Sequence, residues 1–211
     1  MSAERIPEAR TPATARASLG PVARIKRRFY LELAGWSTTF RRNDAAFKHY
    51  DSALRVSPED PLVLASMGFA LAKQDRKREA IACFDRAIAT NPHGAEWHFD
   101  RAFLLQELNH HDEAIPGFER AIALNPNHDR AYYGLGLSLI HLRRLDEAVP
   151  PLERNTKLQP MSPYGWYQLG RTQFNRGKVD KAQAIIDHLS HFEPKVAGQL
   201  ARETGLRAPA T

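Results

Sequence analysis

Cysteine is almost absent from the chain, and its scarcity excludes two kinds of structure. The only cysteine among the 211 residues is Cys83. A single cysteine cannot form an internal disulfide framework, and it cannot build a cysteine-rich zinc site. We therefore expect an intracellular protein in a reducing compartment, and we interpret Cys83 as a small buried apolar residue.

Long apolar runs are also missing. A membrane-spanning helix needs about 18 consecutive apolar residues, and no segment approaches that length. The N-terminus lacks the continuous apolar core of a secretory signal. Together with the single cysteine, these features predict a soluble, cytoplasmic protein.

The body of the chain has little excess charge of either sign. Residues 1–28 contain seven basic and two acidic side chains, so they account for +5 of the net charge of +6. Only +1 remains for residues 29–211. A nucleic-acid-reading surface on the body is therefore not indicated.

Sequence motifs for catalysis are absent. The chain contains no glycine-rich phosphate loop followed by Lys-Ser/Thr, no Gly-x-Ser-x-Gly elbow and no His-Glu-x-x-His helix. Two pairs of histidines could in principle take a metal, His110 with His111 and His188 with His191. Neither pair has a carboxylate or cysteine at matching spacing, so we interpret them as solvated surface residues. We predict no cofactor, no metal and no enzyme activity.

What the chain does contain is an internal period of 34 residues. Prolines recur at this interval at Pro58, Pro92, Pro126, Pro160 and Pro194. Alanines recur at the same interval at Ala46, Ala80, Ala114, Ala148 and Ala182. Because two residue types keep one interval five times, the sequence predicts a tandem repeat.

Each repeat has the pattern of two helices. Ala80, Phe84 and Ala87 fall at i, i+4 and i+7, which places them on one helical face where helices interlock. The first helix of the fourth unit contains Gly134-Leu135-Gly136, which we attribute to close helix packing. The two helices of a unit are therefore expected to pack on each other.

Residues at the unit boundaries agree with this division. Asp60-Pro61 and Ser162-Pro163 are expected to begin helices, with the side-chain oxygen as N-cap and proline at the first helical position. Asn91 and Asn125, each before a proline, are expected to end helices. Two residues at one repeat position, in the turn inside a unit, are expected to need a positive φ: Asn109 and Gly177.

The pattern of an aromatic residue, Leu-Gly, Ala-x3-Phe and then proline at period 34 resembles the tetratricopeptide repeat family. The resemblance covers residues 27–196 as five units, 27–60, 61–94, 95–128, 129–162 and 163–196. It implies an all-α fold, an α-solenoid of five helix-turn-helix repeats, followed by a C-terminal capping helix and tail over residues 197–211. Two departures from the pattern are Asn155, where the family prefers a small residue, and Ile186, which replaces the ring.

The resemblance also implies a concave groove lined by the first helix of each unit, at about the second, fifth, sixth, ninth and twelfth positions. Several of these positions are aromatic, which is typical of a site for an extended peptide or an amphipathic helix. For any single ring, ordinary packing between repeats is the alternative. The predicted groove residues are Phe69, Phe99, Asp100, Phe103, Arg130, Tyr133, Leu137, Tyr164, Tyr167, Gln168, Arg171 and Phe174.

Family members that grip acidic chaperone C-termini use Lys at the fifth and Asn at the ninth position. Here those positions hold other residues, such as Ala65 and Phe69 in the second unit. We therefore expect an apolar or aromatic partner motif rather than a carboxylate.

Residues 1–26 form a basic N-terminal arm with no helical period, and we predict that this arm is disordered. It is either a solvating tail or an electrostatic contact for an acidic protein, a nucleic acid or an anionic membrane, helped by Lys26, Arg27, Arg28 and Phe29.

The sequence thus favours a scaffold or adaptor that binds a peptide or amphipathic helix of another protein in an aromatic concave groove. Two alternatives remain open. One is a dedicated chaperone for exported or assembling subunits, and the other is a fixed subunit of a larger complex. No small-molecule substrate is predicted.

Overall fold

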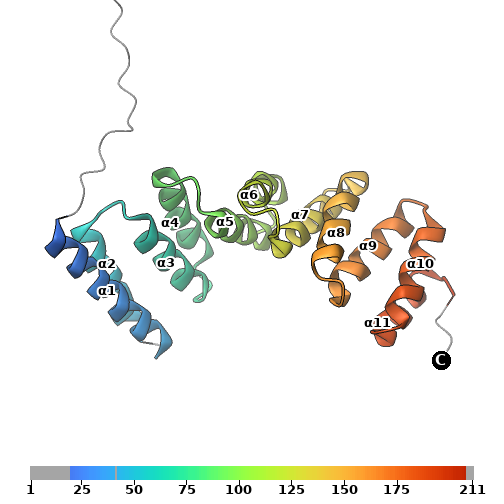
Figure 1. The fold of residues 1–211 in the computed structure, drawn as a ribbon, viewed down its shortest axis with the longest axis horizontal. Helices are drawn as coiled ribbons and strands as arrows, with labels where there is room; N and C mark the ends of the chain where they lie inside the picture. The colour runs from blue at the N-terminus through green and yellow to red at the C-terminus, as the bar shows by residue number, and fades with distance from the viewer. Residues whose placement is uncertain (1–19, 41, 208–211) are drawn as a thin grey trace, which may run out of the picture. The chain divides into compact units, whose positions relative to one another are not determined.

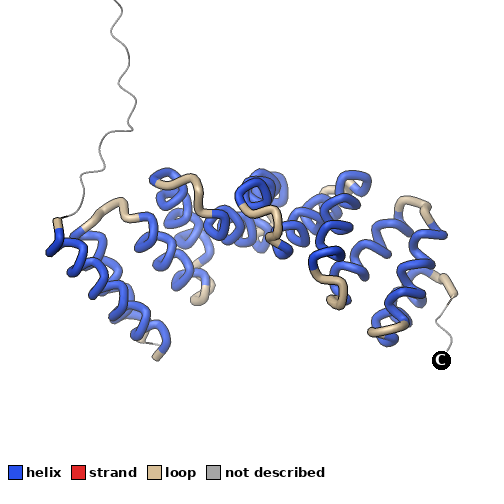
Figure 2. Tube along the Cα trace, in the orientation of Figure 1, coloured by secondary structure: helices blue, strands red, loops and turns tan. Residues whose placement is uncertain are grey.

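The computed structural model describes residues 20–40 and 42–207, and this part of the chain is all helical. It contains eleven α-helices and no strand (Figures 1 and 2). The helices are α1 (Pro21–Thr39), α2 (Asn43–Val56), α3 (Pro61–Ala72), α4 (Lys77–Thr90), α5 (Ala95–Glu107), α6 (His111–Leu124), α7 (Asp129–His141), α8 (Leu145–Leu158), α9 (Pro163–Asn175), α10 (Val179–Ser190) and α11 (Pro194–Thr204).

The chain divides into two compact units. The first unit ends at Pro58, and its described helices α1 and α2 pack against each other. Their contact is built on small residues, since Ala34 of α1 and Ala46 and Ala53 of α2 are fully or almost fully buried. Tyr50 of α2 is also buried, at the repeat position that Phe84 occupies in the next repeat.

The second unit spans residues 59–211 and is a stack of helical hairpins. Each first helix contacts the next first helix, α3 with α5, α5 with α7, and α7 with α9. The second helices α4, α6, α8 and α10 each pack between two first helices, as Figure 1 shows. Helix α11 contacts both α9 and α10, so it takes the place that the first helix of a further repeat would have.

One large side chain in each hairpin of this stack fills the space between helices. Phe84, Phe118, Leu152 and Ile186 follow one another at the period of 34 residues, and each is at most 1% exposed. Glycine makes room for two of them. A Cβ at Gly134 would lie 2.6 Å from the Phe118 ring, and a Cβ at Gly136 would lie 2.7 Å from Leu152. The predicted packing role of these glycines is confirmed.

In the second unit, the turn inside each hairpin has one residue with a positive φ. Asn109 (63°) and Gly177 (74°) adopt it as the sequence predicts. Asp75 (60°) and Arg143 (63°) adopt it as well, at the same repeat position. Arginine is uncommon in this conformation, so the packing of the hairpin, rather than local preference, fixes the turn at Arg143.

The helix starts are only partly as predicted. The Asp60 carboxylate accepts hydrogen bonds from the backbone N–H groups of Leu62 (3.0 Å) and Val63 (3.2 Å), as an N-cap should. The Ser162 side chain makes no such bond, so that prediction is wrong. Proline at position 163 still begins α9, because its φ suits the first helical position and its missing N–H leaves nothing unsatisfied there.

Asn155, where the family prefers a small residue, is accommodated by its neighbours. Its side-chain NH₂ donates to the carbonyl of Asp129 at 2.9 Å. Its Oδ1 would overlap a Cβ at position 165, so Gly165 of the following repeat is what leaves room for it. The larger side chain at position 155 is therefore compensated by the glycine at position 165.

The helical part of the chain begins earlier than the sequence predicts. Helix α1 starts at Pro21, so residues 21–26, which we assigned to the disordered arm, are helical. The apolar residues Val22 and Ile25 continue one face of α1 through this segment. The rest of the predicted arm, residues 1–19, and the end of the predicted tail, residues 208–211, lie outside the described residues. None of the described helices is long and apolar enough to cross a membrane.

The close approach of α7 and α8 is directly testable at Gly136. Replacing Gly136 with alanine should lower the free energy of unfolding by about 1–3 kcal/mol, because the added methyl overlaps the buried Leu152 side chain. The control is Gly198→Ala in α11, where the nearest atom, in Arg202, is 3.6 Å away. This change should stabilise the protein by about 0.5–1 kcal/mol through helix propensity. Urea unfolding measures both, and equal effects would refute the packing argument.

Candidate functional site

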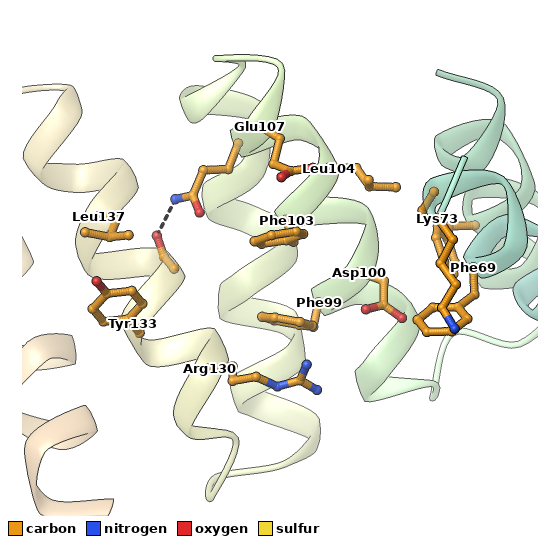
Figure 3. Close-up of a pocket in the computed structure, with 14 residues that line it drawn as sticks. Phe69, Lys73, Phe99, Asp100, Phe103, Leu104, Glu107, Arg130, Tyr133 and Leu137 are labelled. Atoms are coloured by element: carbon orange, nitrogen blue, oxygen red, sulfur yellow. Dashed lines mark hydrogen bonds between the residues drawn. The ribbon is translucent and has the colours of Figure 1, made fainter. Parts of the chain in front are cut away.

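The first helices α3, α5 and α7 line a cleft with a volume of about 560 Å³ (Figure 3). All three helices belong to the second unit. The lining residues are Phe69, Ala72, Lys73, Phe84, Phe99, Asp100, Phe103, Leu104, Gln106, Glu107, Arg130, Tyr133, Gly134 and Leu137. The cleft is mainly apolar, with charged groups at a few places, which is the usual make-up of a binding pocket.

The aromatic rings of the cleft have two different roles. Phe69 is 51% and Phe103 is 42% exposed, so each offers a ring face to a partner. Phe99 is only 5% exposed and lies against Phe118 of the core, with ring centroids 5.9 Å apart. For Phe99 the packing alternative is therefore correct, and its contribution is to support the stacked Phe103 ring, 6.0 Å away.

Two cations lie over aromatic rings at the edge of the cleft. The Lys73 ammonium is 4.6 Å from the centroid of Phe69, and the Arg130 guanidinium is 4.6 Å from the centroid of Phe99. Arg130 also pairs with Glu96 of the preceding repeat at 3.0 Å. These cation–π contacts hold the two long side chains against the wall of the cleft rather than across its opening.

Asp100 is the most unusual group in the cleft. Its side chain is partly buried between the rings of Phe99 and Phe69 (Figure 3), and no side chain in the described ranges hydrogen-bonds or ion-pairs with it. Burial raises the pKa of Asp100 to about 6, with a smaller increase from Glu96 that Arg130 opposes. At neutral pH the cleft thus contains a carboxylate that has lost part of its hydration without gaining a partner.

Hydrogen bonds between repeats fix the α5–α7 side of the cleft. The Gln106 amide donates to the Gly134 carbonyl at 2.8 Å and to the Ser138 hydroxyl at 2.7 Å. Burial raises the pKa of Tyr133, whose hydroxyl hydrogen-bonds with the Gln168 side chain. Because these bonds join adjacent repeats, this wall is preformed rather than assembled on binding.

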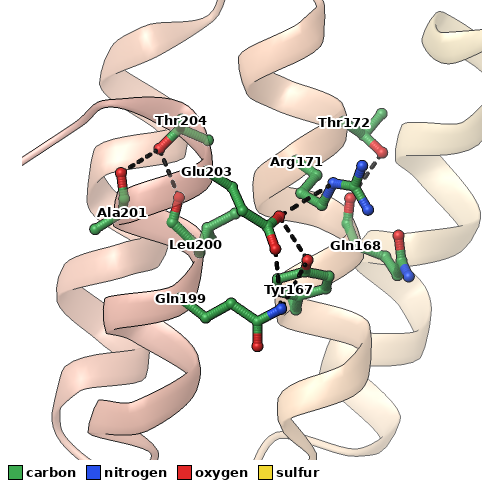
Figure 4. Close-up of polar contacts among 9 residues, drawn as sticks. All are labelled: Tyr167, Gln168, Arg171, Thr172, Gln199, Leu200, Ala201, Glu203 and Thr204. Atoms are coloured by element: carbon green, nitrogen blue, oxygen red, sulfur yellow. Dashed lines mark hydrogen bonds and ion pairs between the residues drawn. The ribbon is translucent and has the colours of Figure 1, made fainter.

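Two of the predicted groove residues on α9, Tyr167 and Arg171, lie outside the cleft and bond to α11. The Tyr167 hydroxyl donates to Glu203 of α11 at 2.6 Å, and Arg171 pairs with the same carboxylate at 3.7 Å (Figure 4). These bonds, together with one from Gln199, lower the pKa of Glu203. Helix α11 therefore engages two of the predicted groove residues of α9, while Tyr164 of the same helix is 71% exposed.

The structure brings seven of the twelve predicted groove residues together in one cleft. These seven are Phe69, Phe99, Asp100, Phe103, Arg130, Tyr133 and Leu137. Tyr164, Tyr167, Gln168, Arg171 and Phe174 lie on α9 and do not line it. Lys73, Leu104 and Glu107 line the cleft but were not predicted, because they follow the concave positions along the helix and reach the cleft by side-chain length.

The interpretation of the histidines needs a correction. His111 is 8% exposed, and its ring stacks on His141 with centroids 3.8 Å apart. It is therefore a packed residue and not a solvated one. His188 is exposed, but its ring packs on Trp166, with the ring centroids 4.3 Å apart. No cluster of three or more potential metal ligands occurs among the described residues.

The geometry first defines a class. Paired helices that stack at a fixed interval and leave a cleft between their first helices make an α-solenoid of helical hairpins. The family model named tetratricopeptide repeat matches residues 66–105 and 100–157. Residues 66–157 therefore consist of tetratricopeptide repeats, and the described part of the chain has the fold of this family.

Solved structures of similar fold agree with this assignment. YrrB, described as a TPR protein with an unusual peptide-binding site, is 22% identical with a TM-score of 0.74, over 83% of this chain and 90% of YrrB. A MamA structure is 20% identical with a TM-score of 0.73, over 88% of this chain and 97% of that one. PilF of Pseudomonas aeruginosa is 17% identical with a TM-score of 0.69, over 87% and 86%. No curated protein sequence matches the chain.

Because burial raises the pKa of Asp100, we predict that this residue makes the protein less stable as the pH rises. Its pKa is raised in the folded state, from 3.8 to about 6, so its contribution to stability falls as pH rises through this window. Asp100→Asn should raise the free energy of unfolding at pH 7.5 by about 1–2 kcal/mol, after allowance for partial exposure. The gain should be much smaller at pH 4.

Thermal unfolding at the two pH values measures this effect, and a gain of about 2–8 °C is expected at pH 7.5. The control is Asp51→Asn, which removes a negative charge from an exposed position in α2. If Asp100→Asn instead lowered the melting temperature at pH 7.5, the carboxylate would be stabilising, and attraction to Arg130 would outweigh its burial.

Proposed function

We propose that the protein is a scaffold that binds a peptide segment of another protein in the cleft between α3, α5 and α7. The observation that carries this proposal is the pair of exposed rings, Phe69 and Phe103, facing one preformed cleft. Large apolar side chains left open to water cost free energy that a partner's apolar side chain would recover. A similar fold, YrrB, is described as having a peptide-binding site, which supports the same class of ligand.

The charged groups define what a fitting segment would look like. Apolar side chains of the peptide would fill the space between Phe69 and Phe103. Asp100 would offer its carboxylate to a lysine, an arginine or a backbone N–H group of the peptide. Lys73 and Arg130 are held on ring faces, so they contribute apolar stem and a diffuse positive potential. The proposed ligand is therefore an apolar segment with a basic or donor group beside its anchor side chain.

This proposal assigns the chain to binding rather than catalysis. The cleft contains one perturbed carboxylate, and its other acid, Glu107, pairs with Lys77 at 3.3 Å. No histidine, cysteine, serine or threonine is among the residues that line it. A chaperone or a fixed subunit of a larger complex would bind its partner in the same cleft. These two cases differ from a scaffold in how long the partner stays bound. Nothing in the described contacts favours either of them over a scaffold.

Selection of peptides from a random library displayed on phage, with the full chain as bait, tests the proposal. The enriched peptides should carry large apolar residues, and titration calorimetry should show that Phe69→Ala/Phe103→Ala weakens a selected peptide by about 2–4 kcal/mol. This is about a thirtyfold to thousandfold loss. Tyr133 also lines the cleft but is half-buried against the core, so its replacement would change packing as well as binding.

The matched control is Met161→Ala/Val179→Ala, which shortens two side chains of comparable exposure, 68% and 45%, outside the cleft. It should leave affinity unchanged. Both double variants should keep the far-ultraviolet circular dichroism of the wild type. If the folded Phe69/Phe103 variant binds selected peptides normally, the cleft is not the peptide site.

A further inference from the structure

Among the described residues of the first unit, the exposed large apolar side chains form one stripe along α1 and its C-cap residue. It consists of Val22, Ile25, Phe29, Trp36 and Phe40, whose side chains are 56–69% exposed. With 3.6 residues per turn, these five positions fall within an arc of about 60° and extend over about 27 Å of helix. Two of the rings, Trp36 and Phe40, stack on each other at 6.0 Å.

The stripe is not the face that packs on α2. The buried side of α1 contains Ala34 and, less completely, Ala23, which point roughly opposite to the stripe. Tyr30, also partly buried, lies between the two faces, and its ring contacts Phe29 at 5.8 Å. Removing the stripe residues would therefore leave the contact between α1 and α2 in place.

The repeat frame shows what this face does elsewhere in the protein. Phe29 and Trp36 are at the third and tenth positions of their repeat. In the fourth and fifth repeats these positions pack on the preceding repeat. Ser138, at the tenth position of the fourth repeat, accepts a hydrogen bond from Gln106 of the third at 2.7 Å, and Gly165 lies against Asn155. Large residues also occur at these positions in the third repeat, but there Leu104 is 4% exposed and Trp97 is partly buried, whereas Phe29 and Trp36 are exposed.

The two ends of the array differ in this respect. The final helix, α11, exposes polar residues such as Lys195, Gln199 and Arg202, which is what a solenoid end needs in water. Helix α1 instead exposes apolar rings at the other end of the sequence. Its N-terminal half also carries Arg24, Lys26, Arg27 and Arg28, of which Arg28 pairs with Glu32, the one acid of α1, at 2.9 Å.

We propose that α1 docks on an anionic phospholipid surface, with the stripe in the headgroup–acyl boundary and its cations on lipid phosphates. An amphipathic helix with aromatic residues on one side and Lys/Arg beside it is suited to this interface. The proposal concerns attachment to the surface and not a crossing of the membrane. It is independent of the peptide cleft, since no stripe residue lines that cleft.

A second copy of the chain is a less favourable partner for the stripe, because the charges of two paired α1 helices are not complementary. If two α1 helices paired in parallel, their cationic halves would lie together. If they paired antiparallel, residues 24–28 would lie near residues 34–38, which contain no acid. Neither arrangement adds a counter-charge to the one that Glu32 gives Arg28, whereas an anionic lipid surface provides counter-charges along the whole helix.

Flotation of the full chain with vesicles tests the proposal. The chain should float with phosphatidylcholine vesicles that contain about a quarter phosphatidylglycerol, and much less with phosphatidylcholine alone. Phe29→Ala/Trp36→Ala should weaken binding at least tenfold. Arg24→Ala/Lys26→Ala should also weaken it about tenfold or more, since each cation near an anionic surface contributes about fivefold.

The matched control is Met161→Ala/Tyr164→Ala, two residues of equal exposure (68% and 71%) in the second unit, and it should float like the wild type. Failure of the wild type to bind anionic vesicles overturns the proposal, as does equal loss in the control. A dimer in light scattering that Phe29→Ala/Trp36→Ala converts to monomer, without lipid binding, would show that a second copy is the occupant.

Discussion

The structure depends on the interlocking of one large side chain per repeat with small residues of adjacent helices. Phe118 shows the constraint most clearly. Its ring is fully buried, it lies between alanines on its own helix, and it reaches into the space that Gly134 leaves on α7. Since the interior is close-packed, the helix spacing is fixed by the size of this side chain and by the absence of a Cβ opposite it. The same relation holds for Leu152 and Gly136, so a period in the sequence becomes a period in space.

The cleft follows from that interlock. Each first helix directs one side to the second helices and must present its other side to solvent, so successive first helices place their exposed positions side by side. Phe69 and Phe103 lie at the ninth position of successive repeats for this reason. Phe99 lies one turn earlier on α5 but is turned toward Phe118, and it becomes part of the core. The boundary between groove and core thus passes between two phenylalanines of the same helix.

The same boundary separates the features that the sequence predicts from those that it does not. The repeat, the helical hairpins and the positive φ at Asn109 and Gly177 come from spacing and local chemistry, which the chain carries in every repeat. Arg143 and His111 were missed because their conformation and burial result from neighbours outside their own helix: the hairpin packing for Arg143 and the His141 ring for His111. The engagement of Tyr167 and Arg171 by Glu203 joins residues 36 and 32 positions apart, and nothing local indicates it.

Asp100 and the α1 stripe illustrate two ways in which a repeat protein can keep a surface ready for a partner. At Asp100 the cost is electrostatic, because a partly dehydrated carboxylate stays ionised only at a penalty, and a donor from a ligand would relieve it. On α1 the cost is hydrophobic, because aromatic rings are exposed at positions that are buried or partly buried in later repeats. The cleft and the first helix are the places where the array can tolerate them, since the side chains there do not set the spacing of the helices.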